Sequence, residues 1–506
     1  MSETAHGTGA PHVVIVGSGL GGLACGSILA RNGYAVTLLE QHHRIGGCLQ
    51  CFRRNGAKFE TGMHFIGSAA PGQTLHRLLR YLEVDGSVQL DELSPDGYDV
   101  VSMGGREYRF AKGRERFIGQ MTEYFPHQRE NLERYYSLIE EIAGASPLHS
   151  LRLADADRMV SPEYQLRSIG DVLDEIITDR KLADVLCGTL PLYAGRRDAT
   201  PFSMHAFIMD FYNQSAYRVA GGSDGIANAL AASIRRSGGK IITGAKVIKV
   251  NFADGKAVAA RLAHGREIPC DIIISDAHPQ ITMNWLDTSL IRAATRRRVN
   301  AIPQTPGGFS LYLKFREDSV PYLNYNYYRF LGDSPWGCET YTEDTWPRGY
   351  LYMHMCHAPH PRFARSAVVL SYMNFDDVRP WADTTVGCRG EEYLEFKRLK
   401  AEKLLDQLYR DFPSLHGCIE SYSTSTPLTY RDYTGTVEGG MYGVARDVNT
   451  GSASRITART RVPNLFQTGQ NINSHGILGV LVGAIVTCSE LIPAKTIYQQ
   501  LLQTDE

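Results

Sequence analysis

A glycine-rich turn near the N-terminus constrains the fold of this chain more than any other feature. The stretch HVVIVGSGLGGLACGSILARNGYAVTLLEQ predicts a strand at His12–Val16, a helix at Leu20–Arg31 and a second buried strand at residues 34–39. A strand–turn–helix–strand order of this kind is typical of a dinucleotide-binding unit with a parallel sheet. The sequence therefore predicts an α/β, Rossmann-like domain at this end of the chain.

The turn carries the spacing GxGxxG at Gly17, Gly19 and Gly22. The first glycine permits a tight turn, the second lets a pyrophosphate approach the backbone, and the third lets the helix pack closely on the strand. The N-terminus of the following helix offers free N–H groups and a partial positive charge to phosphates. Glu40 ends the second strand, where its carboxylate can accept hydrogen bonds from ribose hydroxyls.

A second glycine pair, Gly46 and Gly47, follows closely behind Glu40. This arrangement resembles the two-dinucleotide-binding-motif flavoproteins, and the resemblance implies FAD rather than a nicotinamide cofactor. It places the second glycine pair near the pyrophosphate, with Gln41 and Arg44 as further candidate contacts. Arg44 could add positive charge near the phosphates, but a solvated surface arginine is an equally good interpretation.

The middle of the chain contains a second group of elements with the same α/β character. They are a helix at Asp224–Arg236 and strands at residues 240–243, 246–251, 258–262 and 271–275, with a hairpin turn at Asp254 and Gly255. In FAD proteins of this class, a strand near Val247 contacts the adenine through its backbone. We therefore expect this segment to return to the nucleotide-binding domain.

The stretch VPNLFQTGQNINSHGILGVLVGAIV near the C-terminus is apolar and uncharged. It could be a membrane anchor, a buried helix or part of the cofactor site. Its helical part, residues 476–487, is shorter than the roughly 20 residues that span a bilayer. We therefore expect a strand at 464–468 and a buried helix that bring Gly469, Gln470 and His475 to the flavin.

Three blocks of sequence resemble the carotenoid desaturase, carotenoid isomerase and retinol saturase family, which comprises phytoene dehydrogenase-like flavoproteins. They are VVIVGSGLGGLACGSILARNGYAVTLLEQHHRIGGCLQCF, FETGMHFIG, and STPLTYRDYTGTVEGGMYGV followed by NLFQTGQNINSHGILGV. The second and third blocks are most similar to the saturase branch. This resemblance implies an FAD-dependent oxidoreductase that reduces a C=C bond of an apolar polyene, isoprenoid or lipid, with an unknown electron donor or acceptor.

Two alternatives, and an amine oxidase as a more distant third, remain open at this point. A desaturase or a cis-trans isomerase would use the same fold and cofactor. A flavin-free, prenyl-binding chaperone shares the fold but need not keep Glu40 and the Gly46-Gly47 pair, so both features favour an enzyme.

The resemblance and the element pattern together predict an FAD-binding domain interrupted by an inserted α+β substrate domain. The expected boundaries are 10–85, 215–285 and 456–506 for the FAD-binding segments, 86–214 for a helical cap, and 286–455 for a substrate domain with a β-sheet. Residues 114–196 have a helical, polar pattern, whereas residues 290–410 contain aromatics at strand spacing. The aromatic strands could line an apolar tunnel, and the cap could bring it to a membrane surface.

Flavin chemistry needs few protein groups beyond one that moves a proton. His64, within FETGMHFIG, could donate that proton, although a structural histidine is at least as good an interpretation. In the block around residue 430, Tyr433 and Glu438 could line the site. Glu438 could relay a proton from an apolar pocket that raises its pKa, with a solvated loop carboxylate slightly favoured. Arg431 and Asp432 have the spacing of a simple ion pair.

The bulk composition excludes other classes of function. The chain has 506 residues and a formal charge of −1, which gives no reason to expect nucleic acid as a partner. Its ten cysteines lack the spacing of a disulfide framework, and the first ten residues lack an apolar core, so we expect a cytoplasmic protein, peripheral to a membrane at most. We predict no metal site, although a CxxC pair and a histidine cluster at His354, His357 and His360 have ligand-type residues.

Overall fold

A five-stranded parallel sheet unites three distant parts of the chain, in the order β10-β2-β1-β14-β20. The computed structural model describes residues 9–151 and 162–504. The strands of this sheet are β1 (His12–Val16), β2 (Ala35–Leu39), β10 (Lys240–Ile242), β14 (Ile272–Ser275) and β20 (Leu465–Gln467). The expected Rossmann-like sheet is confirmed, because the first, middle and last segments all contribute to it.

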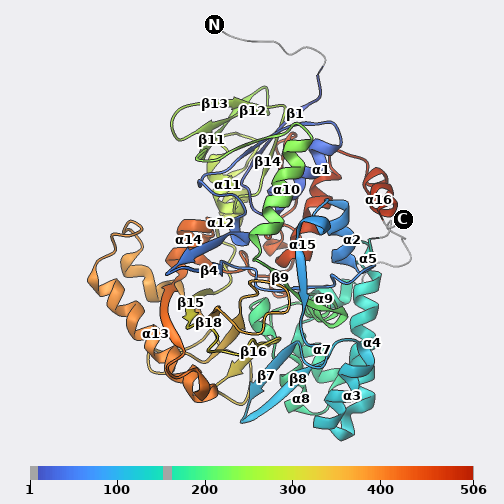
Figure 1. Cartoon of the computed structure of the whole chain (residues 1–506). Helices are drawn as coiled ribbons and strands as arrows, with labels where there is room; N and C mark the ends of the chain where they lie inside the picture. Colours follow the sequence, from blue (N-terminus) through green and yellow to red (C-terminus); the bar gives the residue numbers. More distant parts are fainter. Residues whose placement is uncertain (1–8, 152–161, 505–506) are drawn as a thin grey trace.

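Helices cover one face of this sheet and a β-meander covers the other (Figure 1). The helices are α1 (Leu20–Arg31), α2 (Thr74–Tyr81), α10 (Asp224–Arg236), α15 (Gly476–Cys488) and α16 (Ala494–Gln503). The opposite face carries β11 (Val247–Ala253), β12 (Lys256–Leu262), β13 (Glu267–Pro269), α11 (Pro279–Trp285) and α12 (Ala293–Asn300). The uncharged helix α15 packs on α1 and is almost wholly buried. Within the described ranges, no helix is long and apolar enough to cross a bilayer.

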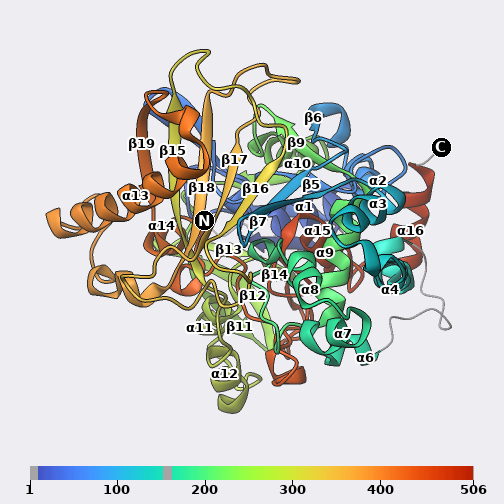
Figure 2. The same ribbon diagram turned by 90° about the horizontal axis from the view of Figure 1, so that it is seen from below.

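A seven-stranded mixed sheet forms the second half of the molecule, in the order β19-β15-β18-β17-β16-β7-β8 (Figure 2). Its strands are β7 (Asp99–Met103), β8 (Arg106–Phe110), β15 (Gly307–Phe315), β16 (Asn326–Phe330), β17 (Gly349–His354), β18 (Ser366–Met373) and β19 (Ile419–Ser425). Only β7 and β16 pair in parallel. Strands β7 and β8 come from the segment expected to be a helical cap, so that segment is also part of the sheet.

Each face of the large sheet has its own apolar core. The helices on one face come from the cap segment, and they are α3 (Arg114–Tyr124), α4 (Arg129–Ala145), α5 (Pro147–Ser150), α6 (Pro162–Leu166), α7 (Ile169–Ile176), α8 (Arg180–Leu186) and α9 (Phe202–Gln214). The long helix α13 (Glu391–Asp411) covers the other face. The aromatics that alternate along β16 and β17 therefore pack into two cores, one on each face of the sheet.

Short strands connect the two halves. They are β3 (Cys51–Arg54), β4 (Ala57–Glu60), β5 (Ile66–Gly67), β6 (Gln89–Glu92) and β9 (Ala216–Ala220). Arg218 on β9 is 1 % exposed, and its guanidinium donates to the backbone oxygens of Leu323 and Tyr325 at 2.9 and 2.8 Å and to Asn326 Oδ1 at 3.1 Å. This buried guanidinium fixes the small sheet to the loop that enters β16.

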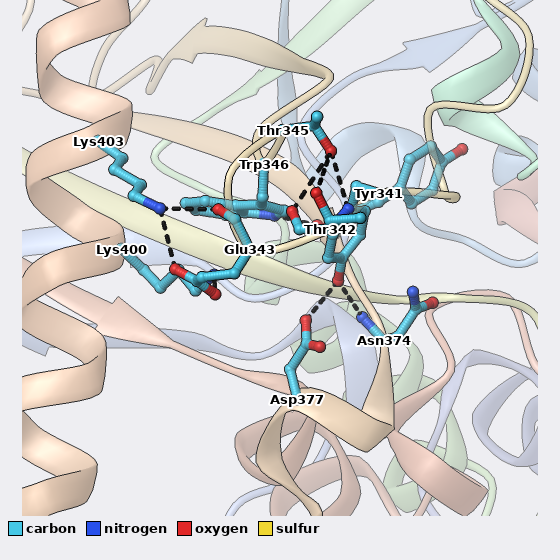
Figure 3. Close-up of polar contacts among 10 residues, drawn as sticks. Tyr341, Thr342, Glu343, Thr345, Trp346, Asn374, Asp377, Lys400 and Lys403 are labelled. Carbon is cyan, nitrogen blue, oxygen red and sulfur yellow. Dashed lines mark hydrogen bonds and ion pairs between the residues drawn. The ribbon is translucent and has the colours of Figure 1, made fainter.

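The loop before β17 is fixed to helix α13 by charged side chains (Figure 3). Lys400 is 1 % exposed, its Nζ lies 2.6 Å from Glu343 Oε2, and it stands 4.5 Å from the centroid of the Trp346 ring. Lys403 also donates to Glu343, at 2.9 Å. Burial of an ammonium group requires such a partner, so this ion pair has a structural role in the packing of α13.

Candidate cofactor and active site

The carboxyl ends of three parallel strands meet at one edge of the nucleotide sheet. Val16 of β1 pairs with Ser275 of β14, and Ser275 pairs with Gln467 of β20. The residues that follow these strands therefore gather at the same place, as is usual for ligand sites in open α/β sheets. They include Gly17 and Gly469, whose φ angles are +104° and +93°.

The GxGxxG motif and the Gly46-Gly47 pair lie together at this edge. A Cβ atom on Gly22 would stand 2.1 Å from the backbone oxygen of Gly17, so only glycine fits between the helix and the turn. A Cβ on Gly47 would lie 3.1 Å from Cα of Gly19, and Gly46 has a φ of +113°. The two glycine motifs thus form one backbone-lined cradle at the N-terminus of α1.

Glu40 holds this cradle in shape. Its Oε2 accepts hydrogen bonds from the backbone N–H of Ser18 at 3.0 Å and from the Ser18 hydroxyl, and its Oε1 accepts from the N–H of His42 at 2.8 Å. The Gly46 N–H in turn donates to the Ser18 backbone oxygen at 2.9 Å. Glu40 therefore joins both glycine motifs, while its contact with a ribose stays a prediction.

Asp276, which the sequence analysis did not single out, fills the cradle. Its Oδ2 lies 2.5 Å from the position a Cβ would take on Gly19, and its Oδ1 lies 2.4 Å from that position on Gly469. The backbone N–H groups of Gly22 and Gly19 hydrogen-bond to this carboxyl group. Burial, and then the negative charge of Glu40, raise the pKa of Asp276 to about 7.

A side-chain carboxylate on these amides tests the chemistry of the cradle directly. Oriented backbone N–H groups at a helix N-terminus select an anion. A Cβ on Gly19, Gly21 or Gly469 would lie 2.5, 2.6 or 2.4 Å from a carboxyl oxygen of Asp276, so only glycines leave room for this group. These are the properties that a pyrophosphate needs, so the residues present fit FAD. The only sequence signal for Asp276 is its position immediately after the strand predicted at residues 271–275, and that signal alone does not single out the residue.

His475 lies at the N-terminus of α15, and its contact with a flavin stays a prediction. The imidazole lies 4.7 Å from the Tyr442 ring, between centroids. Burial, and then the charge of Arg446, lower the pKa of His475 to about 4, so the ring is neutral at physiological pH. Gln470, also predicted here, is half-buried beside Gly469.

The other predicted cofactor contacts lie around this centre. Val247 is buried at the start of β11, opposite Leu262. Gln41 and Arg44 are both exposed, and Arg44 Nη1 donates to the backbone oxygen of Cys51 at 3.3 Å. The surface-arginine interpretation of Arg44 therefore fits its surroundings better than a buried phosphate contact.

The three candidate catalytic residues occupy different environments. His64 Nδ1 lies 3.5 Å from Glu60 Oε2, and the side chains are 10 % and 7 % exposed. Tyr433, in contrast, is 43 % exposed and stacks on His42, with ring centroids 5.9 Å apart. Glu438 is also exposed and has a φ of +52°, which fits the slightly favoured solvated loop carboxylate rather than an apolar pocket.

The ion pair expected beside these residues is confirmed, and it is larger than expected. Arg431 Nε lies 2.9 Å from Asp432 Oδ1, and Arg389 binds the other oxygen of the same carboxylate. Helix α14 (Pro427–Thr434) is thereby joined to the segment before α13. A structural role follows for all three charges.

The histidines and cysteines with ligand-type spacing have separate partners. His354 bonds to Tyr352 and to the Leu323 N–H, His357 to Ser366, and His360 to Asp91. Burial raises the pKa of Cys48 to about 11 and that of Cys51 to about 12, which disfavours the reactive thiolate. In the described parts of the chain, no group of three His, Cys, Asp or Glu side chains is arranged to hold a metal ion.

Comparisons with known proteins cover nearly the whole chain. The model of the family described as flavin containing amine oxidoreductase matches residues 20–489. All-trans-retinol 13,14-reductase of Rattus norvegicus is 29 % identical over 96 % of this chain and 86 % of its own length. Prolycopene isomerase 1, chloroplastic, of an Oncidium hybrid cultivar is 24 % identical over 95 % of this chain and 83 % of its own.

Solved structures show the same fold. An oxidoreductase from Methanosarcina mazei superposes with a TM-score of 0.62 at 18 % identity, covering 94 % of this chain and 99 % of its own. A CLA-producing fatty acid isomerase from P. acnes gives a TM-score of 0.63 at 14 % identity, covering 95 % and 99 %. The likeness therefore includes the large sheet and its helices as well as the nucleotide domain.

Proposed function

The chain belongs to the flavin containing amine oxidoreductase family and is an FAD-dependent enzyme, and on this basis we propose that it reduces a C=C bond of an apolar polyene or related lipid. The observation that carries the proposal is the match to a retinol 13,14-reductase over 96 % of the chain. Such a match includes the substrate half, whereas the nucleotide motif alone is shared with enzymes of very different substrates.

An apolar substrate of this kind partitions into lipid, so the proposal includes transient contact of the protein with a membrane surface. Failure of the protein to float with lipid vesicles would contradict that contact.

The protein has to hold its cofactor and supply one proton. FAD, when bound, carries the electron pair that becomes a hydride. His64 is the proton donor in this proposal, because it is largely buried and faces a carboxylate. Glu60 accepts the Ser223 N–H at 3.0 Å through Oε1, which leaves Oε2 directed at His64 Nδ1. The fixed carboxylate would orient the imidazole and its other nitrogen.

An isomerase is the second candidate, since a prolycopene isomerase matches 95 % of the chain. The two functions differ in their overall balance. A saturase consumes two electrons and two protons for each double bond, whereas an isomerase returns every atom and electron to its substrate. Only the saturase therefore needs a continuing supply of reductant.

The deciding experiment is anaerobic incubation of the dithionite-reduced protein with a panel of polyenes that includes all-trans-retinol and prolycopene. We expect a product two hydrogens heavier than its substrate, identified by mass and retention time. A product of unchanged mass and altered retention time would replace the saturase with the isomerase. No change in any polyene would reject both.

Replacement of His64 by glutamine is expected to slow this reduction by about 10²- to 10⁴-fold, the usual contribution of a positioned general acid. Flavin content should stay unchanged, because His64 does not line the glycine cradle. The measurement is single-turnover product formation by reduced enzyme, with His127→Gln as the matched control at an exposed histidine. An unaltered rate in His64→Gln would remove the proton-donor role and leave His64 structural.

A further inference from the structure

A cavity of about 420 Å³ lies between helix α9, the segment 446–457 and the loop that leads to α15. One part of its wall is apolar, and the residues of that part are Leu166, Pro201, Met204, Phe207, Ile456 and Ile472. Leu166 is 58 % exposed. The volume is within the range of pockets that bind small molecules.

Two arginines, Arg446 and Arg455, supply the polar part of the same wall. Arg446 is half-buried, and its Nη2 donates to the backbone oxygens of residues 471, 472 and 473 at 3.1, 3.0 and 3.1 Å. Arg455 Nη2 donates to the amide oxygen of Gln165 at 3.1 Å. Neither guanidinium forms an ion pair with a carboxylate in the parts of the chain that the structure describes.

The acidic group of the cavity is engaged elsewhere. Asp447 Oδ2 binds Arg196 Nη2 at 2.8 Å, and its Oδ1 accepts the Asn449 N–H, also at 2.8 Å. His149 adds no positive charge to the cavity, because burial lowers its pKa to about 4. Among the residues that the structure describes, the two cationic groups that line the cavity therefore have no acid of their own.

The cationic end of the cavity adjoins the cofactor segment. Arg446 bonds to the loop immediately before His475, and burial followed by the charge of Arg446 lowers the pKa of that histidine. Asn473 and Ser474 of this loop line the cavity itself. A group bound between the two arginines would thus lie next to the loop from which α15 begins.

We propose that this cavity binds the anionic head group of an amphiphilic substrate, such as a polyene carboxylic acid, with Arg446 and Arg455 as the head-group ligands. The inference rests on the proposed function, and it narrows the substrate class from neutral polyenes to acids with an apolar chain. A carboxylate would supply the counter-charge that no described acidic side chain gives to the half-buried guanidinium, through short charge-assisted hydrogen bonds. The apolar wall would cover the first part of the chain.

The test is equilibrium binding to the flavin-loaded protein, measured by quenching of intrinsic fluorescence. The probes are all-trans-retinoate, all-trans-retinol, which has the same chain without the charge, and palmitate, which has the charge without the polyene. We expect retinoate to bind at least about tenfold more tightly than retinol. Arg455→Gln should remove most of that preference and leave retinol affinity nearly unchanged.

Two further variants test whether the preference for retinoate depends on these two arginines. Arg446→Lys keeps the positive charge but loses the planar fork, so it should retain part of the preference. Arg235→Gln, at an exposed position on α10, is the matched control and should leave the preference intact. Equal loss in Arg235→Gln and Arg455→Gln would overturn the assignment, because a general surface field would then explain the binding.

The outcomes separate this inference from the proposed function. Equal affinity for retinoate and retinol in the unaltered protein would overturn the anion site but leave a polyene reductase intact. Tight palmitate binding that Arg455→Gln removes, with no binding of either polyene, would support the anion site and reject the polyene substrate. Absence of binding by all three probes would overturn the site.

Discussion

Replacing Gly22 by alanine is expected to remove FAD from the protein almost completely. The new Cβ would lie 2.1 Å from the Gly17 backbone oxygen, and it would also meet the side chain of Asp276 at 3.2 Å. Neither the strand β1 nor the helix α1 can move away, because β1 lies inside the sheet and both elements contribute side chains to the core between the sheet and its helices. Relief of the clash must therefore open the cradle, and we expect FAD to bind more than about 100-fold more weakly, equivalent to about 3 kcal/mol.

The measurement is the ratio of flavin absorbance to polypeptide in the purified protein, followed by titration of the flavin-free form with FAD. Gly119→Ala is the matched control, since a Cβ on that α3 residue meets nothing within 4 Å. The control should keep its flavin and gain a little stability from the helix. A Gly22→Ala protein with full flavin content would show that α1 does not bind the pyrophosphate. Circular dichroism would establish that the variant is folded.

The nucleotide half of the fold was predictable because its signals are local. A β-branched run, a glycine turn and a helical pattern each occupy one short stretch, and β1, α1, α10 and α15 begin where the sequence places them. The parallel sheet then follows from the order of these elements. His475 and Gly469 were predictable for the same reason, because a strand–turn–helix at the C-terminus can complete the same sheet.

Environments that depend on distant contacts were not predictable. The expected cap segment supplies β7, whose parallel partner on β16, residues 326–329, lies more than two hundred residues away, so no local pattern assigned this strand to the sheet. For Glu438 the sequence left two environments open, an apolar pocket and the slightly favoured solvated loop, because apolar residues and glycines surround it in sequence. Its exposed side chain and left-handed backbone fit the second environment. No local pattern contains that information.

The position of Asp276 in the cofactor site also depends on distant contacts. Its carboxyl group is the basis of the second prediction, which concerns the pH dependence of FAD binding. As an isolated aspartate after a strand, it has no motif. Only the parallel pairing of β14 with β1 brings its carboxyl group onto the amides of Gly19 and Gly22. The cradle thus holds a titratable carboxyl group of its own before any cofactor arrives.

We expect FAD binding to weaken as the pH rises, and Asp276→Asn to abolish this dependence. The pKa of Asp276 is raised to about 7 by burial and by Glu40 in the flavin-free protein, and an adjacent pyrophosphate would raise it further. Below that pH the carboxyl group is already protonated, and the affinity should be constant. Above it, binding must take up one proton, so the Kd should rise about tenfold for each pH unit.

Titration of the flavin-free protein with FAD between about pH 6 and pH 9 measures this slope directly. Asp276→Asn should bind as the protonated form does at every pH, which makes it about 100-fold tighter than the unaltered protein two units above the pKa. Asp383→Asn, at an exposed acid, is the matched control and should retain the slope. The same raised pKa lowers the stability of the flavin-free fold as the pH increases from about 4 to 7, because the folded state there holds a proton that the unfolded chain releases. An FAD affinity that does not change with pH in the unaltered protein, or weaker FAD binding by Asp276→Asn, would mean that the carboxylate does not contact the pyrophosphate. Its role would then be to shape the glycine turns.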